Sequence, residues 1–270
     1  MSLVLHLSDT HFGTERAEVV EALLQLAREQ QPDVAILSGD ITQRSRTPEF
    51  AAARKFIDAL AARSKLILPG NHDIPLFEVW QRLFAPYRNL RRAFGRELEP
   101  DYEDDAVLII GVNTTSRFRH VDGRVSSRQI ERVRRRLLRC PASRLKLVVT
   151  HQPVHVQHVE DEHNLLHGRR AAMQVWSAAG ADLILGGHIH LPFTQALQEV
   201  HQLPREIFAV QAGTAVSRRT RAGAPNSVNL IRHQPGTAKC AVERWDYDAD
   251  QQRFAPGSIT DLALDRRPLH

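Results

Sequence analysis

The stretch LILPGNHD, residues 66–73, ends an apolar run at Pro-Gly and then places three different polar side chains in succession. Asn71 offers an amide oxygen, His72 an imidazole and Asp73 a carboxylate. The apolar part is typical of a buried β-strand. Because ligands of open α/β sheets bind beyond the carboxyl ends of the strands, this strand end predicts a functional site.

Four other apolar runs end in the same kind of residue. The runs cover residues 4–8, 34–39, 145–150 and 183–187, and the polar residues that follow them are Asp9, His11, Asp40, His151, His188 and His190. One Asp after a strand is typical of a turn, and a lone His is more often a core residue. Five strand ends that together supply four His, two Asp and one Asn are hard to explain as turns, so we expect them to converge on one site.

Helical periodicity separates the first three strands. Residues 15–30 and 47–63 carry apolar side chains at helical spacing, so the chain begins strand, helix, strand, helix, strand. This alternation is typical of right-handed crossovers and a parallel sheet, and it predicts an α/β fold. The same rhythm returns later, with helices predicted at 126–139 and 168–179 and strands at 106–112, 145–150 and 182–185.

The rhythm breaks in two places. Residues 75–105 predict a short helix to Phe84 and then an irregular, charged stretch, which we interpret as an insertion or a lid near the site. After Leu191, short apolar runs predict an antiparallel second sheet, and they cover residues 207–212, 228–233 and 241–247. The residues from about 251 onward are expected to be a tail that packs on a neighbour or a partner. We find no clear linker, so residues 1–270 are expected to form one domain.

Composition is that of an ordinary globular chain, with 42% hydrophobic and 25% charged residues among 270. No apolar run approaches the ~20 residues of a membrane helix, and no signal peptide is recognised, so no membrane partner and a cytoplasmic location are expected.

Cys140 and Cys240 form no metal-ligand spacing and no disulfide framework. The net charge of +5 suits an anionic substrate. The histidines of the loop 152–170 are irregularly spaced, and we leave them outside the metal ligands.

Asp, His and Asn side chains without thiols suit divalent first-row metals, here Mn or Fe first, with Zn or Co as alternatives. Seven ligands are too many for one tetrahedral ion with an open position, and they suit two ions ~3.5–4 Å apart. Asp40 is the predicted bridge, because it stands alone after a glycine and a carboxylate can bind two metals. Asp9 and His11 are two positions apart, so on an extended strand end their side chains point the same way and can bind one ion. The same spacing separates His188 from His190.

Charge favours a phosphate ester as the substrate. Two divalent ions, Asp9, Asp40 and a hydroxide sum to about +1, which attracts an anion and stabilises charge on phosphoryl oxygens. We therefore expect a metal-bound hydroxide to attack phosphorus. His72 is the candidate acid for the leaving alkoxide, or a phosphate contact, with Asp73 orienting it. An eighth ligand or a supporting hydrogen bond is the alternative role for His72.

Taken in order, Asp9-x-His11, Gly39-Asp40, Gly70-Asn71-His72-Asp73, His151 and Gly187-His188-x-His190 resemble the signature of the calcineurin-like metallophosphoesterase superfamily. The resemblance implies a four-layer αββα sandwich of two mixed sheets, with a dinuclear metal site at the strand ends. It implies two ligand sets that share Asp40: the first is Asp9, His11, Asp40 and His190, and the second is Asp40, Asn71, His151 and His188. The Ser-Asp-Thr-His opening is most similar to the bacterial class III cyclic-nucleotide phosphodiesterase branch.

The leading hypothesis is therefore a phosphodiesterase for small anionic esters, with cyclic nucleotides as candidates. A nuclease would need a basic groove with aromatic side chains, and three Trp and three Tyr do not favour a nucleic-acid partner. A phosphomonoesterase is a further alternative, and a non-enzymatic metal-binding scaffold ranks last because every ligand position is filled. A homodimer stays an open alternative.

Overall fold

The strands that precede the predicted site residues belong to two mixed β-sheets in the computed structural model, which describes residues 2–119, 121–221 and 223–268. The first sheet has the order β12-β11-β10-β1-β2-β3. Its strands are β1 (Ser2–Leu7), β2 (Val34–Leu37), β3 (Ser64–Ile67), β10 (Ser227–His233), β11 (Lys239–Asp248) and β12 (Arg253–Ala263). β1, β2 and β3 run parallel, and β10 joins β1 in the antiparallel sense.

The second sheet has the order β4-β5-β6-β7-β9-β8. Its strands are β4 (Asp101–Glu103), β5 (Val107–Gly111), β6 (Leu145–Val149), β7 (Leu183–Gly186), β8 (Phe193–Ala196) and β9 (Phe208–Gln211). The four central strands are parallel, and the edge strands β4 and β8 are antiparallel to their neighbours. The carboxyl ends of β6 and β7 therefore lie at one edge of this sheet.

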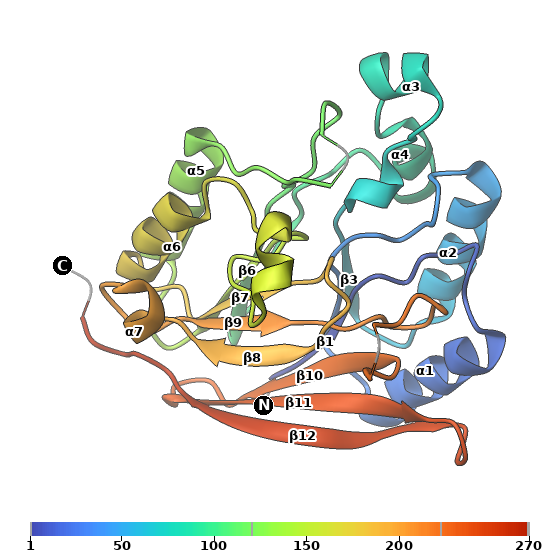
Figure 1. Ribbon diagram of the computed structural model, residues 1–270. Helices are drawn as coiled ribbons and strands as arrows, with labels where there is room; N and C mark the ends of the chain where they lie inside the picture. Colours follow the sequence, from blue (N-terminus) through green and yellow to red (C-terminus); the bar gives the residue numbers. More distant parts are fainter. Residues whose placement is uncertain (1, 120, 222, 269–270) are drawn as a thin grey trace.

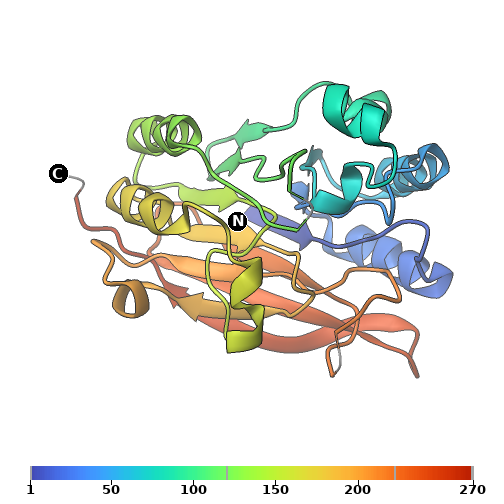
Figure 2. The same ribbon diagram turned by 45° about the horizontal axis from the view of Figure 1, so that its top comes forward.

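Helices cover the outer face of each sheet. The helices are α1 (Ala17–Gln30), α2 (Thr47–Ala59), α3 (Val79–Phe84), α4 (Arg88–Phe94), α5 (Ser127–Arg139), α6 (Arg169–Ala178) and α7 (Gln198–His201), with short 3-10 turns η1 (Asn71–Asp73) and η2 (Val159–Asn164). Figure 1 shows α1 and α2 on one flank and α5 and α6 on the other, and Figure 2 shows the same arrangement with the top of the molecule tilted forward.

Strand alternation explains the layers. Leu3, Leu5 and Leu7 of β1 pack with residues of α1 and α2, whereas Val4 points to the opposite face and packs between the two sheets. In the second sheet, Ile110 packs under α5 and α6, and its neighbour Ile109 packs between the sheets. The predicted four-layer αββα sandwich is confirmed.

The predicted helices are present with small shifts. α5 begins after Ser126, whose hydroxyl accepts a hydrogen bond from the Gln129 backbone while the Gln129 side chain accepts one from the Ser126 backbone. This reciprocal capping explains why the helix begins there. α2 ends at Ala59 rather than near residue 63, because Leu60 is already extended.

The stretch 75–105 is more regular than expected. It forms α3, α4 and the strand β4, which pairs with β5, so the expectation of an irregular stretch is wrong. Figure 1 shows α3 at one extremity of the molecule. Whether this stretch acts as a lid stays a prediction.

The strands after Leu191 do not make a sheet of their own. β9 inserts into the second sheet beside β7, and β10 and β11 extend the first sheet from β1. The apolar runs do form strands, but their partners depend on contacts that a local pattern does not contain. The predicted tail from about residue 251 is also wrong, because Arg253–Ala263 forms the long edge strand β12 along β11.

Candidate metal centre and active site

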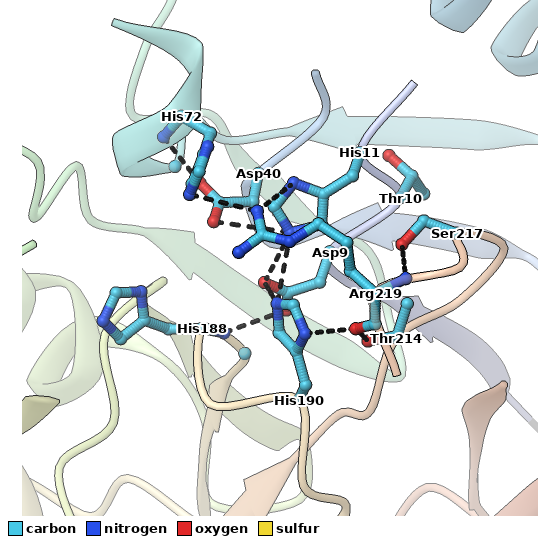
Figure 3. A network of polar contacts seen from close by, with 12 residues as sticks. Asp9, Thr10, His11, Asp40, His72, His188, His190, Thr214, Ser217 and Arg219 are labelled. Carbon is cyan, nitrogen blue, oxygen red and sulfur yellow. Dashed lines mark hydrogen bonds and ion pairs between the residues drawn. The ribbon is translucent and has the colours of Figure 1, made fainter. Parts of the chain in front are cut away.

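All seven predicted metal ligands meet at the carboxyl edge of the parallel strands. Asp9 and His11 follow β1, Asp40 follows β2, and Asn71 begins η1 after β3. The second sheet contributes His151 after β6, and His188 and His190 after β7. Because the two sheets face each other, these strand ends converge. Figure 3 shows five of the seven side chains, those of Asp9, His11, Asp40, His188 and His190.

A first cluster contains Asp9, His11 and His190. Nε2 of His190 lies 3.2 Å from Oδ1 of Asp9, and Nε2 of His11 lies 3.7 Å from the same oxygen. The two Nε2 atoms of His11 and His190 are 3.1 Å apart. Three potential ligand atoms therefore point to one small volume.

A second cluster contains Asp40, His151 and His188. Nε2 of His151 lies 3.3 Å from Oδ1 of Asp40 and 3.2 Å from the amide oxygen of Asn71. The rings of His151 and His188 meet edge to face, with centroids 5.1 Å apart. The amide oxygen of Asn71 thus lies beside these three residues, where it could serve as a fourth ligand.

Asp40 belongs to both clusters. Its Oδ1 faces His151, and its Oδ2 lies 3.8 Å from Nε2 of His11. Oδ1 also accepts a hydrogen bond from the backbone of His72. The two oxygens of one carboxylate therefore face two different sets of ring nitrogens, as a bridging ligand requires.

The backbone is bent to place these side chains. Among the described residues, nine non-glycine residues have positive φ, and five of them are Asp9, His11, Asp40, His188 and His190. A left-handed conformation costs a non-glycine residue about 1–2 kcal/mol. Strain of this kind persists where the surrounding structure enforces it, and it is typical of functional sites.

Three histidines are oriented by backbone carbonyls. Nδ1 of His151 lies 2.9 Å from the carbonyl of Ser38, and Nδ1 of His190 contacts the carbonyl of Arg219. Nδ1 of His72 lies 2.8 Å from the carbonyl of Gln43. A carbonyl can only accept, so each Nδ1 carries a proton and each Nε2 faces the site. This is how proteins fix the tautomer of a metal-ligating histidine.

Burial and neighbouring charges shift the pKa values of the site's histidines and carboxylates in different directions. Burial lowers the pKa of His11 to about 3 and that of His188 to about 4, so both rings are neutral and able to ligate a metal. Burial opposes charge on His151 as well, but Asp40 raises the pKa of His151 to about 9. Burial would raise the pKa of Asp9 and of Asp40, yet neighbouring histidines hold both carboxyl pKa values well below the ordinary value.

His188 gives an independent test of whether a metal fits. Both of its ring nitrogens are shielded from solvent and have no hydrogen-bond partner within the described residues. A buried polar atom without a partner costs about 1–3 kcal/mol. A cation bound between His188, His151 and Asp40 would satisfy the unprotonated one of these two nitrogens, and the neutral ring is in the state that metals require. The donor set of carboxylates, imidazoles and one amide fits a pair of divalent ions.

His72 lies at the rim of this centre. Its ring stacks edge to face on His11, with centroids 4.9 Å apart, and a ligand atom of His72 forms a third cluster with His11 and Asp40. A cavity of about 130 Å³ adjoins it, and the cavity is lined by Gln43, Arg44, His72, Ile74, Leu76 and Phe77. The structure therefore places His72 next to the expected ions and next to space for an organic group.

The expectation that Asp73 orients the His72 ring is corrected. Nδ1 of His72 contacts Gln43, whereas both carboxylate oxygens of Asp73 accept from the loop after β2 and from Gly70. The turn η1 directs the Asp73 side chain back under its own loop. Asp73 accepts from the backbone of Ile41, Thr42 and Gly70, and it thereby ties the loop after β2 to the loop after β3. Burial, and then Asp40, raise the pKa of Asp73 to about 6.

Arg219 is a site residue that the sequence did not indicate. It lies between β9 and β10, and Nη1 reaches to 3.2 Å from Nε2 of His72 (Figure 3). One arginine in a basic stretch gives no signal in the sequence.

The cysteines and the loop histidines were expected to lie outside the metal ligands. Cys140 and Cys240 are free and buried, and His155 of the loop 152–170 contacts His201. Among the described residues, no helix is long and apolar enough to cross a bilayer.

Comparison with known proteins gives a family match over most of the chain. A family model described as calcineurin-like phosphoesterase matches residues 2–192, which include all seven predicted ligands. The strands β8 to β12 lie beyond residue 192, although they complete both sheets.

Curated relatives are similar at low identity. A glycerophosphodiester phosphodiesterase from Enterobacter lignolyticus is 36% identical over 84 residues, which is 26% of this chain and 29% of that protein. A probable glycerophosphodiester phosphodiesterase from Arcobacter nitrofigilis is 25% identical over 70% of this chain and 71% of its own length. A probable cyclic nucleotide phosphodiesterase from Rhodococcus erythropolis is 25% identical over 71% of this chain and 65% of its own length.

Solved structures share the fold. The purple acid phosphatase PPD1 from yellow lupin superposes with a TM-score of 0.68 at 9% identity, over 97% of this chain and 53% of that one. Vps29 from Chaetomium thermophilum superposes with a TM-score of 0.51 at 10% identity, over 98% of each chain. At these identities the likeness concerns the fold alone.

Proposed function

Because the chain belongs to the calcineurin-like phosphoesterase family, we propose that it is a metal-dependent phosphodiesterase for a small phosphodiester, with a 3',5'-cyclic nucleotide as the leading candidate. The observation that carries the proposal is the position of Asp40, whose two oxygens face separate clusters of ring nitrogens. A shared carboxylate of this kind is what a two-ion phosphoester site needs.

The metal ligands would divide into two sets that share Asp40. The first set is Asp9, His11, Asp40 and His190, and the second is Asp40, Asn71, His151 and His188. When bound, the ions would supply Lewis acidity and activate the water that attacks phosphorus. Mn or Fe is the proposed pair, with Zn or Co as alternatives, because imidazole and carboxylate donors suit all four metals.

The chain's own residues prepare the site for an ester. The carbonyls of Ser38 and Arg219 hold His151 and His190 with Nε2 toward the metal position. The carbonyl of Gln43 holds His72 with Nε2 toward the centre. We assign His72, when Nε2 is protonated as well as Nδ1, to protonation of the leaving alkoxide or to contact with a phosphoryl oxygen. The leaving group of an alkyl diester is a strongly basic alkoxide that needs a proton.

A glycerophosphodiester is a second candidate substrate, because two relatives bear that activity in their names. Both candidates are small diesters, and the cavity beside His72, about 130 Å³, suits a small organic group. A nuclease or a phosphomonoesterase of the same superfamily is the broader alternative, and a non-enzymatic scaffold is the least favoured.

The test is a substrate panel on protein loaded with Mn, Fe or Zn. The panel compares cyclic nucleotides, glycerophosphodiesters, phosphomonoesters and oligonucleotides. The proposal predicts that a small diester has the highest kcat/KM, and preferential cleavage of oligonucleotides or monoesters would contradict it. Metal analysis accompanies the panel: Asp40→Asn should lose bound metal and activity together, whereas Asp58→Asn, on the exposed face of α2, should keep both. Full metal content in Asp40→Asn would contradict the bridging role.

A further inference from the structure

Arg219 brings a positive charge to the edge of the metal centre from outside the region that the family model matches. It lies in the loop between β9 and β10, and its side chain is half-buried. Nη1 lies 3.1 Å from the amide oxygen of Gln43, 3.2 Å from Nε2 of His72 and 3.4 Å from Nδ1 of His11. The guanidinium therefore reaches across the rim, as Figure 3 shows.

The loop that bears Arg219 is firmly held. The carbonyl of Arg219 accepts from Thr214 and His190, and its backbone nitrogen donates to the hydroxyl of Ser217. Asn226 donates to the carbonyls of Thr214 and Ser217 and closes the loop from the other side. The backbone of Arg219 is thus part of the centre, and its side chain starts from a fixed point.

The acceptors around this guanidinium are weak ones for a full positive charge. Within the described residues, Nη1 meets two imidazole nitrogens and an amide oxygen, with no carboxylate among its partners. Two divalent ions held by Asp9 and Asp40 would add further positive charge beside it. A cation in that position is stabilised when an anion enters, and the planar guanidinium fork matches phosphate oxygens.

We propose that Arg219 binds a non-bridging phosphoryl oxygen of the substrate, and the corresponding oxygen of the phosphomonoester product. This inference rests on the proposed phosphodiesterase function for its substrate. An ionised oxygen forms about twice as strong a hydrogen bond as a neutral acceptor, so it displaces the imidazole of His72 from Nη1. Nε2 of His72, which accepts from Arg219 in this structure, is then free to take up a proton from water and to pass it to the leaving oxygen.

A role of Arg219 in phosphate binding and a role that only orients histidines predict different results when its side chain is removed. If the Arg219 side chain only positioned His11, its removal would disturb metal binding, and the affinity for phosphate would fall only as far as metal was lost. If it binds phosphate, its removal weakens anion binding while the metal content is unchanged, because the carbonyl that contacts His190 belongs to the backbone and is retained.

The experiment uses the metal-loaded full chain with Arg219→Ala and Arg219→Lys. Arg218→Ala is the matched control, since Arg218 is the exposed neighbour on the same loop. Isothermal titration calorimetry with inorganic phosphate gives Kd, and elemental analysis gives the metal content. Arg219→Ala should raise Kd for phosphate about 10- to 100-fold with metal content unchanged, Arg219→Lys should raise it less, and Arg218→Ala should change it less than about 2-fold.

An unchanged phosphate Kd in Arg219→Ala would overturn the proposal, and so would loss of metal from that variant. The two proposals fail separately. If the wild type cleaves diesters and Arg219→Ala has the same kcat/KM and the same Kd for phosphate, the role of Arg219 is disproved and the proposed function stands. Protein that binds phosphate through Arg219 but cleaves no diester would remove the function and support the anion contact.

Discussion

A Cβ on Gly70 would lie 2.0 Å from the backbone nitrogen of Asp40 and 2.2 Å from its Oδ1. No side chain fits there, because the loops after β2 and β3 touch backbone to backbone at this point. Gly70→Ala should therefore displace Asp40, with loss of bound metal and a loss of stability of about 1–3 kcal/mol from overpacking. Metal analysis and denaturant unfolding measure both effects.

Gly236→Ala is the control for this substitution. Gly236 has a φ of +79°, and a Cβ at this position would have no neighbour within 4 Å, so a methyl group there strains only the backbone. It should lower stability by about 1 kcal/mol and keep the full metal content. Equal metal content in the two variants would show that Gly70 does not set the position of Asp40.

Removal of metal should destabilise the fold as well as stop activity. Nε2 of His11 and Nε2 of His190 face each other at 3.1 Å, and the nitrogens of His188 have no hydrogen-bond partner in the described residues. Ions that bind the folded state at about 100 times Kd stabilise it by about 2.7 kcal/mol. Treatment with a chelator should therefore lower Tm by roughly 5–10 °C, measured by calorimetry, and added Mn should restore it.

The variant Asp40→Asn is the control for the chelator experiment. If it has lost its metal, its Tm should be insensitive to chelator. A wild-type Tm that does not respond to chelation would mean that these side chains do not bind ions in the folded protein.

The proposed role of His72 predicts a dependence on the leaving group. His72→Ala should keep its metal and slow cleavage of alkyl diesters about 100-fold, because general acids contribute about 10²–10⁴-fold. Cleavage of nitrophenyl diesters, whose leaving group needs no proton, should slow by less than about 10-fold. A series of kcat/KM values against leaving-group pKa measures the difference, with His167→Ala, an exposed histidine, as control. An equal loss along the series would contradict the acid role.

Phe77 offers a way to test whether α3 and the turn before it contact the substrate. Phe77 is 75% exposed, and it lines the cavity that His72 also lines. If the organic group of the ester packs there, Phe77→Ala should raise KM about 5- to 10-fold for a diester with a large planar group, from the lost apolar contact. The same variant should leave KM unchanged for the smallest diester. Ile259→Ala removes a similarly exposed side chain from β12 and should change neither.

The ligands could be predicted from the sequence because strand ends have a fixed place in a sheet. Asp9, Asp40 and His151 each follow a recognisable apolar run, and parallel strands bring their carboxyl ends to one edge. The facing of the two sheets, which brings His151 to Asp40, follows from the family resemblance and not from any local pattern.

What could not be predicted depends on side-chain direction and distant pairing. Asp73 is adjacent to His72 in sequence, yet η1 turns its carboxylate toward Ile41 and Thr42. Arg219 reaches His72 across 147 residues of chain, and no spacing rule connects them. The residues of β12 look like a tail in the sequence because most of them are exposed and alternate poorly, whereas their pairing with β11 is a contact between strands.

The C-terminal segment after β12 predicts a pH dependence of stability. Asp265 receives hydrogen bonds from the side chains of Arg267 and Arg205, which hold the pKa of this carboxyl at about 2, below its ordinary value. A carboxyl whose pKa is depressed by folding stabilises the native state above its unfolded pKa, and the contribution disappears as pH falls through the folded pKa. The contribution of Asp265 should therefore be complete above about pH 4 and lost toward pH 2.

Asp265→Asn should lower Tm at pH 7, and the difference from the wild type should shrink between about pH 4 and pH 2. Asp261→Asn, an exposed carboxyl on β12, is the matched control and should change Tm by less than about 1 °C. Thermal unfolding of the three proteins across this range measures the difference directly. A Tm difference for Asp265→Asn that stays constant from pH 7 to pH 2 would mean that the ion pairs of Asp265 with Arg205 and Arg267 do not contribute to folding.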